Sequence, residues 1–515
     1  MFLVTTADQR FWKTDEKILF LGEWCRLYDQ KSVWSQLDCD VLPHHWGNND
    51  QFNQDFEALP ALREKVLLHL VPTMNELHGV DYSTRYWRIV LGAWLFQFID
   101  IFYDRYKSIF EATRSGKVTH TWVPSLEPSE CVPKDFVTFD QWCIQDSYNQ
   151  VIYGWIIRQL KQISYEIKGG IEKISIYENV APGPDLKWKN VLVKILGRFS
   201  RCVPDALNGV VFYASFIKPW ELVRLQLTLG QMPYLRGPEV AVRDFPVNYE
   251  KRKLIQLSFA TSSFETLLQK IIPAQIPKIY IEGYADMGRR SLEAFPKSPK
   301  VVFTSVGLYA HEGFKFWAAK QVEQGVRLVV SQHGGAYGSS RVYMLEEFEV
   351  DCSDHYFSWG WQDNNSPKII PMPSGQLERV RKTIKPDPAG SILMMGWELP
   401  RYFWLGYSAP VSSKMIGFFA DHEQFVAGLS KEARKLLVLR LYQFDQGWGV
   451  DERWRKFDPT ISTSRGGNSI YRQLNKSRLA VNTYNSTVHL ETLSANFPTL
   501  FFWRDRWQNI LFQFY

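Results

Sequence analysis

The sequence predicts an α/β protein in which two parallel-sheet units face each other across a cleft and follow a helix-rich N-terminal region. From about residue 206, apolar runs of four to six residues alternate with amphipathic segments, which is typical of parallel strands covered by helices on both faces. A proline-rich stretch at 364–390 interrupts this alternation, as an interdomain connector would. The chain of 515 residues is also too long for one core. The expected domains are 1–205, 206–385 and 386–515.

The N-terminal region shows mainly helical periodicity. Leu62 and Val66 belong to a series of apolar residues at helical spacing. The most apolar stretch, 89–103, is short and contains Asp100, so a buried helix is expected there rather than a membrane span. Further expected elements are a strand at 17–25, a loop over 116–138, and helices at 139–165 and near 189–199.

The two later units are expected to repeat a strand–loop–helix order. In the first unit, strands are expected to open the segments 208–216, 277–288, 300–325 and 326–335, with helices at 219–230 and 314–325. In the second unit, expected strands at 391–398, 435–442, 478–487 and 498–503 alternate with helices at 414–429, 469–477 and 488–496. Ligands of open parallel sheets bind outside the carboxyl ends of the strands, so the loops that follow these strands are the candidate site.

Composition narrows the class of protein. The hydrophobic fraction of 45% and the charged fraction of 22% are those of a folded globular chain. The net charge of +6 fits an anionic substrate or a lipid surface, and no dense basic run argues for nucleic acid. The aromatic fraction of 15% suits sugar-binding clefts or membrane edges, although thick cores explain it more simply.

The cysteines and the N-terminus predict a cytosolic protein, at most peripheral to a membrane. No CxxC pair occurs, which favours free thiols in a reducing compartment. The first residues show no basic-then-apolar leader. The six cysteines are Cys25, Cys39, Cys131, Cys143, Cys202 and Cys352.

The turn after the predicted strand at 478–487 is the candidate donor site. Asn485, Ser486 and Thr487 precede a predicted helix, and free N–H groups at a helix N-terminus bind phosphate. Glu491, about one turn later, could accept hydrogen bonds from two ribose hydroxyls, and Arg440 at a second strand end could face the same phosphates. Equally, the turn could be only a helix cap and Glu491 a solvated residue.

A second candidate is the stretch "QHGG". His333 follows an apolar strand and precedes Gly334 and Gly335, which can adopt left-handed backbone angles and form an anion-binding nest. A histidine beside such a nest can act as a base or as a cation next to phosphate. The alternative is a buried imidazole that bonds a backbone carbonyl and ends the strand.

Carboxylates near other predicted strand ends could supply a base or nucleophile for glycosyl transfer. Those favoured are Asp286, Glu282 and Glu346. No His, Asp and Glu set shows a regular metal-ligand spacing, so no metal is expected, and "PHHW" at 43–46 is interpreted as structural or substrate-facing. The dinucleotide, P-loop and GxSxG motifs are also missing from the sequence.

Six blocks of the sequence carry a resemblance. They are "LGEWCRLYD" (21–29), "HGVDYSTRYWRIVLGAWL" (78–95), "FKFWAAKQVEQG" (314–325), "QHGGAYG" (332–338), "SDHYFSWGW" (353–361) and "TYNSTVHLETLSANFPTLFFW" (483–503). In this order, along nearly the whole chain, they resemble a transferase family, of leptospiral type, encoded in bacterial O-antigen and surface-polysaccharide clusters. The resemblance implies a GT-B-like architecture with a nucleotide-sugar donor in the C-terminal half and an acceptor across the cleft. No cofactor besides the nucleotide-sugar co-substrate is expected.

Two motifs of that family carry over by position. One is His-Gly-Gly, matched by His333, Gly334, Gly335 and Tyr337; the other is acidic then aromatic, matched by Glu346, Glu349, Ser353, Asp354 and 359–361. The sequence departs from the second motif at Glu347 and Phe348, where the resemblance leads us to expect Asp-His. A histidine with a catalytic role at that position in relatives cannot have one here.

The sequence therefore predicts a metal-independent glycosyltransferase of surface-glycan synthesis, with CMP-activated ulosonic acids among the candidate donors and a lipid-linked or oligosaccharide acceptor. Arg85, Arg88 and Trp359 are acceptor candidates, although a capped helix explains the two arginines more simply. One alternative is transfer of a polyol phosphate from a CDP-activated donor, with His333 as the base. Another, from a different class, is a non-catalytic glycan-binding or scaffold protein.

Overall fold

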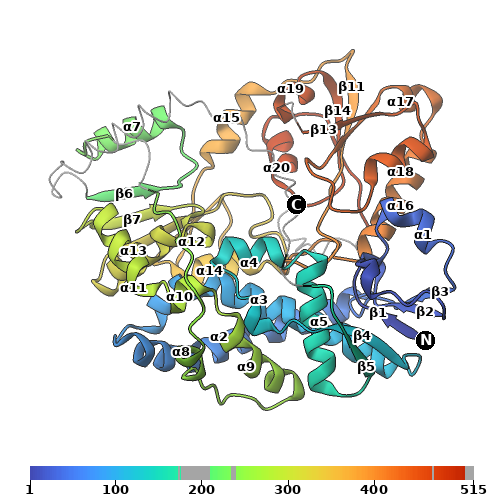
Figure 1. Ribbon diagram of the computed structural model, residues 1–515. Helices are drawn as coiled ribbons and strands as arrows, with labels where there is room; N and C mark the ends of the chain where they lie inside the picture. The colour runs from blue at the N-terminus through green and yellow to red at the C-terminus, as the bar shows by residue number, and fades with distance from the viewer. Residues whose placement is uncertain (172–173, 175–208, 234–238, 467–468, 505–515) are drawn as a thin grey trace.

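The computed structural model describes residues 1–171, 174, 209–233, 239–466 and 469–504. Within these residues the strands form three five-stranded sheets, and every pair of neighbouring strands is parallel. In Figure 1 the middle sheet lies at the left, the C-terminal sheet at the upper right and the N-terminal sheet at the lower right. The α/β class is confirmed.

The N-terminal region contains a sheet that the sequence analysis did not predict. Its order is β3-β2-β1-β4-β5. Only the strand within 17–25 was expected, because three-residue strands carry too little pattern to detect. The fourth strand lies in the segment 116–138, which proline and serine make look like a loop. The strands are β1 (Phe2–Val4), β2 (Ile18–Phe20), β3 (Cys39–Val41), β4 (His120–Pro124) and β5 (Ser164–Lys168).

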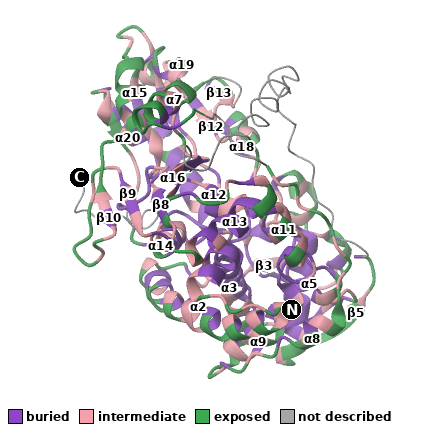
Figure 2. Ribbon diagram, turned by 90° about the vertical axis from the view of Figure 1, so that its left-hand side faces the viewer, coloured by how far each residue is buried: buried purple, intermediate pink, exposed green. Residues whose placement is uncertain are grey.

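The buried helix expected at 89–103 is confirmed and forms the centre of the molecule. It is part of α3 (Thr84–Arg114), and 21 of its residues are buried. It packs against helices of both the N-terminal and the middle sheet, and it is drawn in purple at the core in Figure 2. Asp100 within it is fully buried and accepts two hydrogen bonds from Arg63, at 2.9 and 2.6 Å. The helices around it are α2 (Asn49–His78), α4 (Phe136–Trp142) and α5 (Asp146–Leu160).

The middle sheet has the order β10-β9-β8-β7-β6, so strands that follow one another in the chain are neighbours. The strand expected at the start of 277–288 is wrong: "KIYI" is a helical turn, and a helix follows it. A buried apolar run of four residues does not distinguish strand from helix. The strands are β6 (Val210–Tyr213), β7 (Val301–Thr304), β8 (Arg327–Ser331), β9 (His355–Ser358) and β10 (Ile369–Pro371). The helices are α7 (Pro219–Thr228), α8 (Tyr249–Lys253), α9 (Ser263–Gln275), α10 (Lys278–Ile281), α11 (Tyr284–Ala294), α12 (Gly307–Ala310), α13 (Glu312–Glu323) and α14 (Met344–Cys352).

The C-terminal sheet has the order β13-β12-β11-β14-β15, and its predicted strands and helices are all present. The expected connector at 364–390 contains β10 and α15 (Gly375–Thr383), the latter packed against α20. The strands are β11 (Ser391–Met395), β12 (Leu437–Leu441), β13 (Ser462–Arg465), β14 (Ser477–Asn482) and β15 (Thr499–Phe501). The helices are α16 (Lys414–Ala427), α17 (Lys431–Lys435), α18 (Val450–Phe457), α19 (Ile470–Leu474) and α20 (Thr487–Ser494). The helix expected near 189–199 lies outside the described residues.

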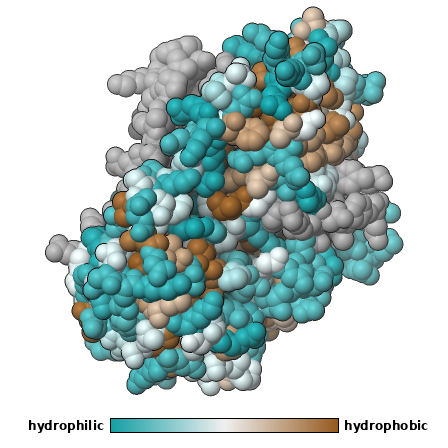
Figure 3. Space-filling model, turned by 90° about the vertical axis from the view of Figure 1, so that its right-hand side faces the viewer, coloured by the Kyte–Doolittle hydropathy of each residue, from teal (hydrophilic) through white to brown (hydrophobic). Residues whose placement is uncertain are grey.

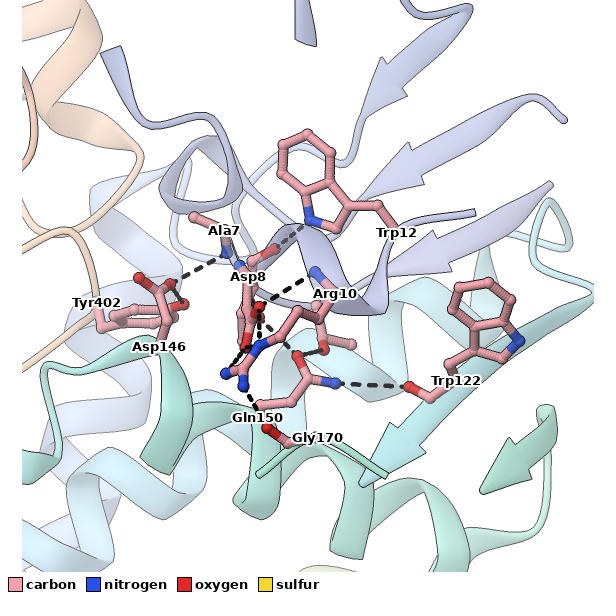
Figure 4. Close-up of polar contacts among 11 residues, drawn as sticks. Ala7, Asp8, Arg10, Trp12, Trp122, Asp146, Gln150, Gly170 and Tyr402 are labelled. Carbon is pink, nitrogen blue, oxygen red and sulfur yellow. Dashed lines mark hydrogen bonds and ion pairs between the residues drawn. The ribbon is translucent and has the colours of Figure 1, made fainter. Parts of the chain in front are cut away.

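A buried carboxylate joins the N-terminal sheet to the segment that follows β11. Asp146, the first residue of α5, accepts hydrogen bonds from the Ala7 amide (3.1 Å) and the Tyr402 hydroxyl (2.5 Å) through one oxygen (Figure 4). Its other oxygen accepts from Arg401 at 2.6 Å. The ion pair is almost fully buried, so losing either partner would leave a buried charge that lacks compensation.

The surface seen in Figure 3 is mostly hydrophilic, with apolar residues in several separate groups. Among the described residues, no helix combines the length and the apolar character needed to cross a membrane. The five described cysteines are free thiols, as expected, and Cys202 lies outside the described residues.

Candidate active site

The loop after β8 and the N-terminus of α20 meet where the middle and C-terminal sheets adjoin. The Gly335 amide donates a hydrogen bond to Thr487 Oγ1 at 3.0 Å. Asn485 Nδ2 donates to the hydroxyls of Ser339 (2.9 Å) and Ser340 (3.2 Å). The "QHGG" turn and the "NST" turn, which the sequence analysis assigned to opposite sides of one cleft, are therefore in direct contact.

The two glycines of this turn do not have the backbone conformation that the sequence analysis expected. Neither Gly334 nor Gly335 has a positive φ, so the predicted left-handed nest is wrong. Gly335 is needed for a different reason: a Cβ there would lie 2.3 Å from the backbone oxygen of Ser486. Gly334 has room, since the nearest atom to its Cβ position is 3.5 Å away, on Tyr337.

His333 lies in a largely buried pocket of aromatic and acidic side chains. The Tyr337 hydroxyl is 3.2 Å from its Nδ1 and 3.1 Å from its Nε2, and Glu349 Oε1 is 3.7 Å from Nδ1. The ring of Phe216 lies parallel to the imidazole, with centroids 6.0 Å apart. Burial lowers the pKa of His333 to about 4, so the imidazole is neutral at neutral pH and can accept a proton.

Helix α14 brings two further carboxyl groups to this loop. Glu349 is 2% exposed, and burial raises its pKa well above its usual range. Glu346 accepts a hydrogen bond from the Gly338 amide at 2.5 Å, and burial raises its pKa to about 7. Glu346 therefore contacts the loop that carries His333. Its neighbour Glu347 instead pairs with Arg63, at 2.7 Å.

The departure from the acidic–aromatic motif lies on the far side of α14 from this pocket. Phe348 is fully buried, and its ring contacts α3 so closely that a Cβ on Gly92 would be 2.6 Å from it. Trp359 directly follows β9 and is hydrogen-bonded to the loop after β8. Gln332 Oε1 accepts from the Trp359 amide (2.7 Å) and from Trp361 Nε1 (2.8 Å).

Glu282 and Asp286 are not at a strand end, which corrects the sequence analysis. Glu282 follows α10 and receives a bidentate pair of hydrogen bonds from Arg252, both 2.8 Å long. Asp286 lies in α11 and accepts from Arg290 at 2.8 Å and from Arg243 at 3.1 Å. Their partners are arginines rather than the groups around His333.

At the α20 end of the site, Glu491 is buried rather than open to a ribose. It is 3% exposed, and its Oε1 accepts from Gln376 (2.9 Å) and from the Tyr471 hydroxyl (2.8 Å). Burial raises its pKa. Arg440, next to the last residue of β12, donates to Gln473. Both hydrogen bonds of Glu491 are made to its Oε1, so a ribose hydroxyl would have to donate to Oε2 unless Glu491 released these partners.

Asn482 is a buried polar residue that the sequence analysis missed. It ends β14 and is fully buried, yet neither its Oδ1 nor its Nδ2 has a partner among the described residues. Trp397, just beyond β11, stacks on Tyr484 with centroids 4.4 Å apart, and its Nε1 also lacks a partner there. In the order β13-β12-β11-β14-β15 the strand order reverses between β11 and β14, so the connections that follow these two parallel strands lead in opposite directions along the sheet, and such sheets bind ligands at this point. The signal in the sequence was a polar residue ending the apolar run "LAVN".

A comparison with known protein families establishes the broad functional class of this protein. The model for the LIC12162 family transferases matches residues 1–511. The chain belongs to this family. No curated protein matches it. The resemblance found in the motifs is thereby confirmed at the level of a transferase family that spans almost the whole chain.

In this LIC12162 family transferase, the two arginines that the sequence analysis named as acceptor candidates are engaged in ion pairs. Arg85 forms a bidentate pair with Asp354, at 2.9 and 2.8 Å, and Arg88 pairs with Glu64 at 2.6 Å. Ser83 caps α3 by accepting from the Tyr86 amide at 3.2 Å. These contacts favour the simpler interpretation, a capped helix locked to β9.

One cluster of the transferase has metal-ligand residue types. His44 Nε2 and His45 Nε2 each lie 3.4 Å from Asp104 Oδ1, and all three side chains are buried. However, the Trp46 amide donates to His44 Nδ1 at 3.1 Å, so the neutral ring carries its proton on Nε2 and lacks a lone pair there. Arg105 also pairs with Asp104 at 2.5 Å. The Nε2 proton of His44 and the Arg105 ion pair favour charge pairing around a buried carboxylate over metal ligation, although His44 Nε2, His45 Nε2 and Asp104 Oδ1 make no hydrogen bond among the described residues.

We expect Gly335→Ala to destabilise the protein by about 1–3 kcal/mol, because the added methyl meets the backbone at residue 486. Gly334→Ala is the matched control and should change the free energy of unfolding by less than about 1 kcal/mol. Urea unfolding of both variants checks this. Equal losses would contradict the close-approach explanation.

Lowering the pH should reduce the stability of the folded protein through His333. Its pKa is about 4 in the folded protein and near 6.5 when unfolded, so between these values the unfolded chain binds the extra proton. Stability is therefore full above pH 6.5 and falls by about 2 kcal/mol between pH 7 and pH 5 on account of this group. Urea unfolding at both pH values should show a smaller acid loss in His333→Gln than in the wild type.

His78→Gln is the control outside the site, because burial also lowers the pKa of His78 to about 4. Each variant should lose less stability in acid than the wild type does, and only His333→Gln should lose transfer activity. An unchanged acid response in His333→Gln would show that the imidazole is solvated.

Proposed function

We propose that this transferase moves a sugar from a nucleotide-activated donor to a surface-glycan acceptor. The observation that carries the proposal is the contact between Gly335 and Thr487. It joins a buried, neutral imidazole to a helix N-terminus on an open parallel sheet, so a base and a phosphate-binding element adjoin.

The donor site proposed is the carboxyl edge of the C-terminal sheet. The first N–H groups of α20 lack partners within the helix and carry partial positive charge, which favours the donor's phosphates. Arg440 adds a cation near the end of β12, two strands away from β14. Asn482 and Trp397 add buried polar atoms that lack partners among the described residues, at the point where β11 and β14 diverge.

The chemistry proposed needs one base and stabilisation of the leaving group. His333 accepts the proton of the acceptor hydroxyl as that oxygen bonds to the anomeric carbon. The bond from the anomeric carbon to the phosphate oxygen breaks, and the phosphate leaves with the nucleotide. The α20 N-terminus and Arg440 stabilise the negative charge that develops on that phosphate. Tyr337 holds the imidazole in place through its hydroxyl, and Glu349 lies 3.7 Å from Nδ1.

Nucleotide binding tests the donor half of the proposal. One of CMP, CDP, UDP, GDP and dTDP should raise the melting temperature by several degrees, since saturation at a hundred times the dissociation constant adds about 2.7 kcal/mol. Arg440→Gln should reduce the shift. The matched control is Arg478→Gln, because Arg478 lies at the opposite, amino end of β14. No shift with any nucleotide, or equal loss in both variants, would contradict this donor site.

A product assay tests the reaction. Glycosyl transfer leaves the sugar's phosphate on the nucleotide, whereas polyol phosphate transfer carries one phosphate to the acceptor. His333→Gln should keep the nucleotide-induced shift and lose transfer by about 10²–10⁴-fold. Intact nucleotide binding with no turnover on any acceptor would support the non-catalytic alternative instead.

A further inference from the structure

The segment after β6 has a strained backbone at the edge of the candidate active site. Ala214 (φ 46°) and Phe216 (φ 55°) both adopt left-handed angles, which are uncommon for residues other than glycine. The conformation is held by the Ser305 amide, which donates to Ala214 O at 3.2 Å, and by Ser305 Oγ, which donates to Ser215 O at 2.9 Å. Strain that its surroundings maintain is typical of functional sites.

The consequence of this strain is the placement of Phe216. Its side chain is 59% exposed, yet its ring lies parallel to His333. The chain then enters α7 through Pro219. An apolar surface therefore starts beside the imidazole and continues onto this helix.

Helix α7 exposes apolar side chains that a helix in water would normally bury. Trp220 is 76% exposed, the highest value among the large hydrophobic residues of the described ranges, and Leu227 is 60% exposed. Trp220, Arg224 and Leu227 follow one another at helical spacing on the solvent side, whereas the buried residues of α7 are Leu222 and Gln226. In Figure 2 this helix is drawn mostly as exposed. The apolar surface consists of Phe216, Trp220 and Leu227; Leu225, Leu229 and Met232 are exposed as well, but Leu225 and Leu229 lie on the opposite side of the helix from Trp220.

The surface is anchored to the rest of the protein. Glu221 pairs with Arg379 of α15 at 2.8 Å, and Gln231 Nε2 donates to Val210 O at 3.0 Å. Single exposed apolar residues are ordinary, but a gathered set marks an interaction surface.

The basic side chains beside this surface indicate the kind of partner that it binds. Lys218 and Arg224 are exposed next to Trp220, and the acidic residue of α7, Glu221, is neutralised by its arginine. Tryptophan and leucine flanked by basic side chains fit the boundary between acyl chains and anionic headgroups. We propose that α7 and its flanking turns dock this protein on an anionic lipid surface. Docking of α7 on lipid does not depend on the proposed sugar transfer. Combined with the proposed function, it brings a lipid-borne acceptor to His333 past Phe216.

Flotation of the full chain with vesicles tests the docking surface. Binding is expected with vesicles that mix phosphatidylglycerol into phosphatidylcholine, and it should weaken with phosphatidylcholine alone and with added salt. Leu227→Ser should lower the vesicle-bound fraction at limiting lipid by at least about tenfold. The matched control is Leu254→Ser, because Leu254 is 67% exposed but lies outside the surface, and it should bind like the wild type. A wild type that does not float, or an equal loss in both variants, overturns the inference.

A second pair of measurements keeps the two proposals separate. Trp220→Ser should lose vesicle binding and retain the nucleotide-induced rise in melting temperature. If no nucleotide stabilises the protein but vesicle binding follows the pattern above, the proposed function fails and the docking surface stands. A protein partner on α7 without vesicle binding would overturn the lipid assignment.

Discussion

The burial of α3 is the constraint on which the rest of the structure depends. A helix of 31 residues packed against helices of both the N-terminal and the middle sheet leaves no room for unpaired charge, yet it carries Asp100, Asp104 and Arg105 in the core. Each has partners, because an uncompensated buried charge costs several kcal/mol. Arg63 pairs with Asp100 and also with Glu347 on α14. The same ion-pair network thus fixes the helix that carries the site's carboxyl groups.

This packing explains how the candidate site is held. Glu346 and Glu349 are on the side of α14 that faces the loop, and Phe348 on the other side is clamped against α3. The loop between β8 and α14 is then held from the opposite direction by Thr487 and Asn485. A base positioned between two rigid supports loses little entropy when it meets its substrate, and this is how positioning contributes to rate.

The sequence predicted those parts of the fold that have long patterns. The C-terminal alternation, the buried helix at 89–103 and the strand-end location of His333 and Thr487 could all be read from periodicity. The three-residue strands of the N-terminal sheet, and the helical turn at Lys278–Ile281, are too short for any period to show. Arg252, the bidentate partner of Glu282, is 30 residues away in the chain. Their ion pair forms only in the folded structure, so no local sequence pattern predicts it. The need for glycine at 335 likewise comes from a backbone 151 residues later.

The contact at Thr487 would also let the proposed donor and acceptor sites act together. Its hydroxyl accepts a hydrogen bond from Gly335, which leaves the hydroxyl proton free to be donated. A phosphate at the α20 N-terminus would take that proton in a hydrogen bond. The chain from the Gly335 amide through Thr487 to the phosphate would then be polarised along its length, and each bond would strengthen the next. Donor binding would therefore tighten the same loop that carries His333, so the base is best ordered when the leaving group is already in place.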